Sequence, residues 1–447
     1  MNAELKQLCR NSFTTGSTMR HVVLMTLAGV IGISMLFLVD LIDLFYLSHL
    51  KQTAVTAAIG YAGTIVLLNL SLAIGGSVAA AALVARNMGA GNLVQARQYA
   101  TSALLFSLIM SSLLTICIAF GSSSFLSLLG AEGDAKRLAQ SFIWTLSPGY
   151  IFIGGEVCCV AILRALGDVR RSMYISVAAA FVTFCADPIF IFGLGLQIQG
   201  AAVATTLGHL AAFSIGVHKL VKVHKFLNPL GLGGLKRDIP SIWQIAYPAI
   251  LAQLTLPFSN TYVTHLMANF GDEFVAGFAT VCRIIPVAYS VIYSITGSVG
   301  PIIGQNYGAK QINRVRQTIT NSLIFSVGYA LTTSFILFFC RFQIASVFHA
   351  TGHNLEVIVF FCKFIAVSWV FVGAQFLANA VFNNLGHPKL SLVLNWGRAT
   401  FGTVPFALIG AKLGGWEGLL IGNAIGTAIF GVVSIIIAYT IVNKSGN

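Results

Sequence analysis

Two aspartates stand inside a long apolar stretch near the start of the chain, where carboxylates are costly. Residues 37–47 read FLVDLIDLFYL, with Asp40 and Asp43 three residues apart and therefore on one face of a helix. A charged side chain at the centre of a membrane helix costs about 2.5–3.5 kcal/mol, so ionisable residues there are functional by default. For one of the pair, a position facing water near a helix end, or a pairing with a lysine, is an alternative.

A third carboxylate, Asp187, lies in FCADPIFIFGLGLQIQGAAVATTLG (184–208). Pro188 follows it and removes one helix hydrogen bond, which can leave a carbonyl oxygen free. The depths of Asp43 and Asp187 can be counted from Arg20 and Arg171, which stand at the cytoplasmic starts of their spans. The helical rise puts them at roughly 35 and 24 Å, both in the outer half of the membrane. We therefore expect the two carboxylates to come together.

The chemistry expected of such a pair is the binding of a small cation. Carboxylates close together in a site without water can bind a proton near neutral pH. Oxygen ligands around the same carboxylates would suit Na⁺ instead, with Asp43 and Asp187 as its metal ligands. Thr205, in the span that follows Asp187, supplies a first such oxygen.

The composition predicts an all-α, polytopic membrane protein. Of the 447 residues, 57% are hydrophobic and 9% are charged, and the mean hydropathy is +0.85, whereas roughly a quarter of residues are charged in ordinary domains. The first twenty residues are polar and no small-residue cleavage site follows the first apolar run, so we expect no removable signal peptide. Apolar stretches long enough to cross a bilayer predict about twelve spans. These are 20–47, 54–84, 98–120, 138–165, 172–194, 200–221, 240–269, 275–304, 318–340, 356–384, 390–411 and 416–441.

The chain also contains an internal duplication. ARNMGAGNLVQAR (85–97) matches GQNYGAKQINRVR (304–316), and LRALGDVRRS (163–172) matches FNNLGHPKLS (382–391), both at an offset of 219. GAAVATTLG (200–208) matches GLLIGNAIG (418–426) at an offset of 218. Six spans per half predict two parallel repeats around a central cavity. The predicted domains are an N-terminal lobe (1–222), a cytoplasmic linker (223–239) and a C-terminal lobe (240–447).

Charge in the connections predicts the orientation. One set of connections holds nineteen Lys and Arg residues, counting Arg164 and Arg398, and the other holds five. The excess places both termini and the linker in the cytoplasm. The predicted location is the inner (cytoplasmic) membrane. Topology thus explains the net charge of +13 better than nucleic-acid binding does. The eight cysteines form no C-x-x-C pair and indicate neither a disulfide framework nor a metal site.

Other intramembrane residues are candidates for a substrate cavity. Glu156 could line it, or pair with an arginine; Arg283 and Lys363 are possible partners. The histidines at 21, 209 and 265 are more often packed or interfacial than proton carriers. The candidate cavity residues are Glu156, Tyr150, Asn260 and Gln375, with Trp369 and Phe376 as possible parts of an apolar wall.

The pattern resembles the multidrug and toxic compound extrusion (MATE) family, of the MOP flippase superfamily. IDLFYLSHLKQTAVTAAIG (42–60) is similar to that family's first-span signature, ADPIFIFGLGLQIQGAAVAT (186–205) to its fifth and sixth spans, and GQNYGA (304–309) to its second-half loop. The resemblance implies an antiporter that exports organic cations in exchange for protons or Na⁺.

Carried over residue by residue, the resemblance makes Asp43 and Asp187 the coupling carboxylates and Thr205 a hydroxyl near them. Thr183 stands where an asparagine is common, and Asp40 looks like an addition. Ala28 stands where the family often has a proline, so the resemblance does not extend to a proline-dependent bend of the first helix, although the repeat counterpart Pro248 is present. Lys51 replaces a glycine.

The leading prediction is therefore a monomeric, cation-coupled antiporter with coupling in the first half, no cofactor other than H⁺ or Na⁺, and cationic amphipathic cargo. The alternative of the same fold is a lipid-linked precursor flippase. The lack of a His-rich metal cluster, a G-x-S-x-G elbow or a P-loop argues against an enzyme or an ATP-driven pump.

Overall fold

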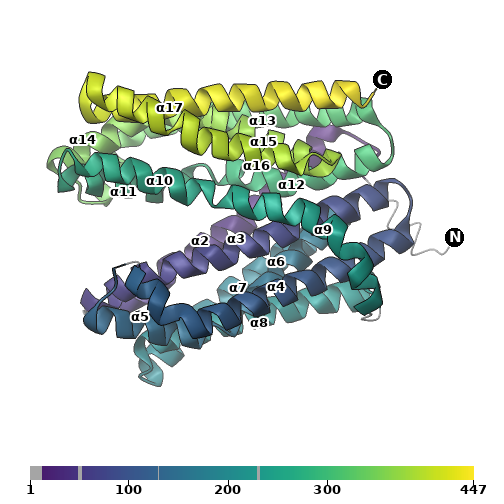
Figure 1. Ribbon diagram of the computed structural model, residues 1–447, viewed down its shortest axis with the longest axis horizontal. Helices are drawn as coiled ribbons and strands as arrows, with labels where there is room; N and C mark the ends of the chain where they lie inside the picture. Colours follow the sequence, from purple (N-terminus) through teal and green to yellow (C-terminus); the bar gives the residue numbers. More distant parts are fainter. Residues whose placement is uncertain (1–12, 49–52, 129, 229–231, 447) are drawn as a thin grey trace. The chain divides into compact units, whose positions relative to one another are not determined.

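The computed structural model describes residues 13–48, 53–128, 130–228 and 232–446, and every regular element in those ranges is a helix (Figure 1). The first half contains α2 (Thr18–Ser48), α3 (Thr53–Gly89), α4 (Leu93–Leu128), α5 (Gly133–Leu146), α6 (Gly149–Ala165), α7 (Val169–Pro188) and α8 (Gln197–His218). Two π-helical turns, η1 (Ile189–Gly193) and η2 (Lys219–Val223), follow α7 and α8.

The second half begins with α9 (Leu232–Gln253), inside the stretch predicted as linker. It continues with α10 (Thr255–Ala268), α11 (Asp272–Ala288), α12 (Ser290–Gly308), α13 (Ile312–Val347), α14 (Gly352–Phe360), η3 (Phe361–Ile365), η4 (Ala366–Ser368), α15 (Trp369–Leu385), α16 (Pro388–Gly397), η5 (Arg398–Gly402) and α17 (Val404–Lys444).

Within the described ranges, eight helices are long and apolar enough to cross a membrane, or up to ten if each of two bent pairs is one span. The bent pairs are α5 with α6, at 53°, and α11 with α12, at 46°. Pro148 lies at the first bend, and Pro286, inside α11, lies just before the second. Gly414 and Gly415 interrupt α17, which holds the end of the predicted span 390–411 and the whole of the span 416–441.

The predicted duplication is visible in the helix boundaries. Helices α4 and α13 have the same length and begin at Leu93 and Ile312, which stand at the offset found between the sequence matches. Helices α7 and α16 begin at Val169 and Pro388, at the same offset. The offset between the short sequence matches is thus also the offset between the first residues of the corresponding helices, as expected for two six-span repeats.

The turn before α4 and the turn before α13 have the same conformation, but only the first has a glycine. Gly91 has φ +74°, and Lys310, at the matching position of the second repeat, has φ +56°. Side chains other than glycine cost about 1–2 kcal/mol in this left-handed region. Lys310 therefore holds a strained backbone that the first repeat avoids.

We expect Lys310→Gly to raise the free energy of unfolding by about 1 kcal/mol, because glycine adopts positive φ without a clash. Thermal unfolding of the purified protein in detergent measures the change. Lys310→Ala is the matched control: it removes the charge and keeps the Cβ, so it should give no gain. Equal stability of the two variants would contradict the strain.

The described residues divide by their contacts into two units, later in the chain than the predicted linker. Unit 1 contains Ile31–Ile250, and unit 2 contains Phe13–Val30 together with the chain from Leu251 onward. Helix α2 is thus shared between them. Its first turns are held in unit 2, where Asn321 Nδ2 donates to Thr18 Oγ1 at 2.6 Å and the Ser294 hydroxyl donates to the Thr26 carbonyl at 3.1 Å.

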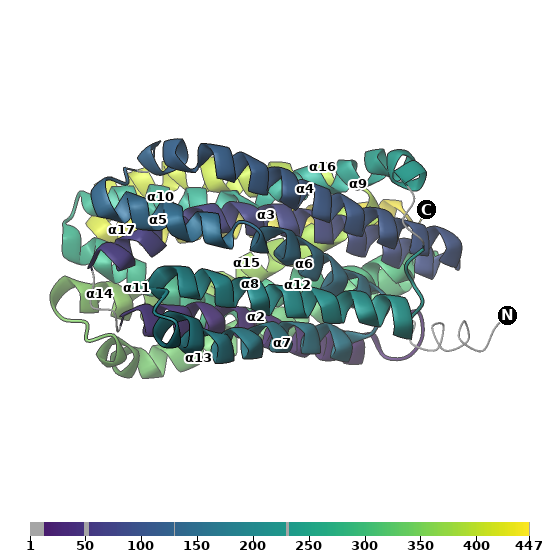
Figure 2. The same ribbon diagram turned by 90° about the horizontal axis from the view of Figure 1, so that it is seen from below.

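Each unit is a helical bundle with an apolar core. In unit 1, α3 packs on α4 and α6, and α7 packs on α8, as Figure 2 shows. In unit 2, α15 packs on both α12 and α17. The second helix of each bent pair, α6 in unit 1 and α12 in unit 2, therefore packs within its bundle.

A polar cluster ties the α6–α7 connection of unit 1 to the end of η2. The Asp168 carboxylate caps α7 by accepting from the Arg171 backbone N–H at 3.1 Å, and it also pairs with the Arg171 guanidinium and with His224 Nε2, the latter at 2.8 Å. Burial raises the pKa of the Asp168 carboxyl, but the hydrogen bonds from His224 and Arg171 outweigh it and lower that pKa from 3.8 to about 2. The charged carboxylate is thus favoured in the folded protein.

Asp168→Asn should destabilise the protein by about 1–2 kcal/mol at pH 7, because it removes the group whose pKa folding lowers. A lowered carboxyl pKa contributes stability that is present above pH 3.8 and lost as the pH falls to 2. The difference in unfolding free energy between wild type and variant should therefore shrink over that interval. A difference in unfolding free energy that does not change with pH would contradict this role of the ion pairs. The control is Asp134→Asn, which removes an exposed ion pair with Arg137.

Candidate functional site

Asp187 is fully buried at the point where the fifth span stops being a regular α-helix. Its side chain is 0% exposed, Pro188 ends α7, and η1 follows at once. The proline has no N–H to donate, and the chain then widens into a π-helical turn, a feature frequent at functional sites. The sequence therefore places a carboxylate where the helix is locally irregular.

Thr205 lies at about the same depth as Asp187. The reason is that α7 and α8 run antiparallel and contact each other one helical turn from both residues. A Cβ built on Gly208 of α8 would lie 2.2 Å from Thr183 Oγ1 and 2.8 Å from the Ala179 carbonyl oxygen of α7. From this contact, Asp187 lies four residues further along α7, and Thr205 lies three residues back along α8. Each of these steps is about one helical turn, and both lead in the same direction. Neither Asp187 nor Thr205 is without an interaction partner.

A second close approach fixes the π-helical turn itself. A Cβ on Gly200, at the start of α8, would lie 2.6 Å from the carbonyl carbon of Phe190 in η1. Gly200 and Gly208 are the outer members of GAAVATTLG, the segment matched between the repeats. Small residues at this spacing let two membrane helices approach closely. Helix α8 therefore contacts the backbone both before and after Asp187 in the chain.

Asp40 and Asp43 belong to α2, but their side chains lie outside the described residues. Tyr46, one turn after Asp43, is described: its ring meets that of Phe192 edge-on, with centroids 6.1 Å apart. Phe192 belongs to η1, the turn that follows Asp187. The helix that carries Asp43 thus passes beside the site of Asp187.

Glu156 has a partner that the sequence did not indicate. Its carboxylate is 2.7 Å from His209 Nδ1, and Glu156 is buried, as a bridge between α6 and α8. The partner expected from the sequence is an arginine, and His209 is expected to be packed or interfacial. Tyr150 is fully buried in an apolar cluster of unit 1.

The second-unit candidates fall into two groups. Asn260 is exposed on α10, whereas Gln375 is fully buried on α15 and donates to the Leu394 carbonyl at 3.3 Å. The two aromatic residues named from the sequence are joined by Tyr293, whose ring centroid lies 5.8 Å from that of Trp369 and 5.7 Å from that of Phe376. Trp369 also stacks on Tyr289 at 4.8 Å.

Arg398 is the functional candidate that the sequence analysis missed, and its assignment to a connection was wrong. It begins η5, between α16 and α17, and is only 6% exposed. Its position inside the predicted span 390–411 was the available signal. Arg283 and Lys363, also placed inside spans, are exposed; the Lys363 ammonium lies over the Phe364 ring at 4.8 Å.

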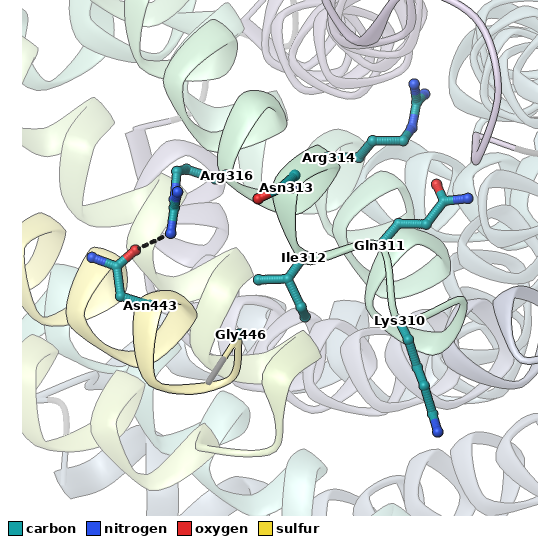
Figure 3. A pocket seen from close by; sticks show the side chains of 8 residues that line it. All are labelled: Lys310, Gln311, Ile312, Asn313, Arg314, Arg316, Asn443 and Gly446. Carbon is teal, nitrogen blue, oxygen red and sulfur yellow. Dashed lines mark hydrogen bonds between the residues drawn. The ribbon is translucent and has the colours of Figure 1, made fainter.

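A hollow of about 560 Å³ in unit 2 lies at the start of α13. It is lined by Lys310, Gln311, Ile312, Asn313, Arg314, Arg316, Asn443 and Gly446 (Figure 3). Arg316 Nη2 donates to Asn443 Oδ1 at 2.7 Å. Arg314 donates to the backbone carbonyls of Phe13, Thr15 and Gly16, and so fastens the segment before α2 to unit 2.

Two repeated six-span bundles, with a buried carboxylate at a broken helix in the first, define a helical membrane transporter. A family model described as MatE matches residues 30–189 and 248–409, well over half of the chain, so the chain belongs to the MatE family. The resemblance inferred from the sequence is confirmed. The family is one of transporters and not of enzymes.

Relatives and solved structures agree with this assignment. The chain is 28% identical over 400 residues to the FAD transporter of Shewanella oneidensis, covering 87% of both chains. It is 23% identical to the probable multidrug resistance protein YpnP of Bacillus subtilis, covering 86% of both. A structure described as the outward-facing conformation of a multidrug resistance MATE family transporter superposes with a TM-score of 0.90, at 23% identity, over 97% of this chain and 98% of that one. The predicted fold of about twelve helices in two repeats is confirmed.

Proposed function

We propose that this multi-pass membrane protein is a secondary active antiporter that exports amphipathic organic molecules in exchange for H⁺ or Na⁺. The observation that carries the proposal is Asp187: a fully buried membrane carboxylate, at a helix break, level with Thr205 and beside the helix that bears Asp43. The chain works as a monomer in the inner membrane with both termini in the cytoplasm, and needs no cofactor beyond the coupling ion.

Coupling follows from the cost of leaving a carboxylate charged in such a place. A proton, or Na⁺ held by carboxylate and hydroxyl oxygens, neutralises Asp187 and favours the conformation in which its surroundings close. An ion that bound both conformations equally would shift nothing, so the site must bind it more tightly in one of them. Release of the ion on the cytoplasmic side then returns the transporter for another cycle.

Two classes of cargo are candidates. The acidic residues of the first half favour organic cations, and one relative, at 21% identity over 366 residues, is the multidrug export protein MepA of Staphylococcus aureus. The relative from Shewanella oneidensis is instead a transporter of FAD, an aromatic dinucleotide with phosphate groups. The buried guanidinium of Arg398, in unit 2, favours this second class. The lipid flippase alternative gains no support from these relatives.

Uptake of ethidium, a fluorescent organic cation, into inside-out vesicles tests the antiport. With a pH gradient and no Na⁺, we expect uptake that stops when the gradient is collapsed, and that is absent from vesicles without the protein. Uptake only with a Na⁺ gradient would keep the site and identify Na⁺ as the ion. Uptake driven by ATP with both gradients collapsed would overturn the proposal. Because ethidium is a cation, the same gradients should be repeated with an aromatic anion, flavin mononucleotide.

A further inference from the structure

Arg398 is a buried cation without a counterion in unit 2. Its side chain forms no hydrogen bond or ion pair with any residue of the described chain, and its Nε and Nη2 atoms are fully buried. Every acidic residue that the structure describes in unit 2 is exposed: Asp272, Glu273, Glu356 and Glu417. A buried charge is normally paired, because the free energy of removing it from water is far larger than the stabilisation that packing provides.

Polar side chains join α15 to α16 in the two turns that precede Arg398. Gln375 donates to the Leu394 carbonyl, one turn before Arg398, and its own Oε1 is fully buried without a donor in the described chain. One turn further back, Asn379 Oδ1 accepts from Ser391 and from Asn395, both at 2.9 Å. These neighbouring amides are satisfied at Asn379 Oδ1, whereas Arg398 Nε and Nη2 and Gln375 Oε1 have no hydrogen-bond partner in the described chain.

An aromatic surface adjoins this polar end. Phe376 directly follows Gln375, whose amide donates to the Leu394 carbonyl one turn before Arg398. The Tyr293 ring contacts Trp369 and Phe376, and the α15 backbone at Phe376 accepts a hydrogen bond from Thr296 at 2.9 Å. Aromatic faces and a guanidinium fork are the groups that bind a flat ring system with an acidic substituent.

The two repeats also use the same span for an ionisable group, with opposite sign. Asp187 is the second-last residue of α7, which the π-helical turn η1 follows, and Arg398 opens the π-helical turn η5 after α16. Helices α7 and α16 are the repeat-related pair that begins at Val169 and Pro388. Each fifth span is thus irregular where its charge stands, as expected where a helix binds a ligand.

We propose that Arg398 binds the phosphate or carboxylate group of an aromatic organic anion, whose ring packs against Tyr293, Trp369 and Phe376. The inference rests on the proposed transport function and names the substrate class of the second unit. Gln375 accepts a hydrogen bond from the same ligand. The coupling ion and the anionic cargo then bind to residues of different units.

Binding of flavin mononucleotide and riboflavin to the purified full chain in detergent tests this, since the two differ by one phosphate. Flavin fluorescence gives both affinities without any gradient. We expect the wild type to bind flavin mononucleotide about 10- to 100-fold more tightly, the range of a charge-assisted pair with arginine. Arg398→Gln should lower the affinity for flavin mononucleotide to that for riboflavin and leave the latter unchanged, and Arg398→Lys should restore part of the difference.

Arg283→Gln is the matched control, because it removes an exposed arginine of the same unit that belongs to no candidate site, and it should change neither affinity. Retained riboflavin binding shows that a variant is folded. Equal affinities in the wild type, a preference that survives Arg398→Gln, or displacement of flavin mononucleotide by equimolar inorganic phosphate would each overturn the proposal. Gradient-driven ethidium uptake together with equal binding of the two flavins would overturn this inference and leave the proposed antiport unaffected. An Arg398-dependent preference for flavin mononucleotide without gradient-driven transport would support this inference and overturn the antiport.

Discussion

Asp187→Asn should abolish gradient-driven export while leaving the protein folded and inserted in the membrane. Asparagine has the size of aspartate, so the packing around this fully buried position changes little. It cannot take up a proton and contributes no negative charge to Na⁺, so the ion no longer favours one conformation over the other. Ethidium uptake into inside-out vesicles should fall to the level of vesicles without the protein.

The same variant should keep its substrate affinity, because the proposed cargo site lies in unit 2. Asp43→Asn should behave like Asp187→Asn if both carboxylates share the ion. Asp134→Asn removes an exposed acid that pairs only with Arg137, and should export like the wild type. Normal gradient-driven export by Asp187→Asn, at normal expression, would remove the coupling site from the first unit.

Gly208→Ala should disrupt the same site without touching a charge. The added Cβ would lie 2.2 Å from Thr183 Oγ1 and 2.8 Å from the Ala179 carbonyl oxygen, so α7 and α8 must separate. Overpacking of this kind costs about 1–3 kcal/mol. Because Asp187 and Thr205 lie one turn from the contact, their separation changes as well. We expect a lower unfolding temperature in detergent and export reduced by about tenfold or more.

Thr183→Ala in the Gly208→Ala background separates the two clashes. It removes the contact with Oγ1 and leaves the contact with the Ala179 carbonyl, so stability and export should recover only in part. Gly328→Ala is the control, since a Cβ there meets no atom within 4 Å; it should be neutral or slightly stabilising. Equal behaviour of Gly208→Ala and Gly328→Ala would mean that the α7–α8 contact does not position the site.

The repeat match between GAAVATTLG and GLLIGNAIG has a structural explanation in unit 2 as well. A Cβ on Gly422 would lie 2.0 Å from the Phe406 carbonyl oxygen, and a Cβ on Gly426 would lie 1.7 Å from that of Gly402. In both halves, the sixth span therefore presents small residues to the backbone of the fifth. The sequence showed this similarity, and the structure gives its physical cause.

The sequence by itself determined the class of protein, the spans and the duplication, because these depend on local composition and on the length of apolar runs. Asp187, followed by Pro188, was recognisable as a coupling candidate from its type and setting alone. Bends within spans and the start of α9 at Leu232 were not, since a hydropathy pattern does not report where a helix turns.

Tertiary structure decided which side chains meet. The pairing of Glu156 with His209, the alignment of Thr205 with Asp187, and the attachment of residues 13–30 to unit 2 all join segments far apart in the chain or on different helices. Arg398 shows the limit most clearly: charge counting assigned it to a connection, and only the packing of η5 against α10, α16 and α17 buries it. Burial and partners are properties of contacts between helices, and the sequence of one helix does not contain them.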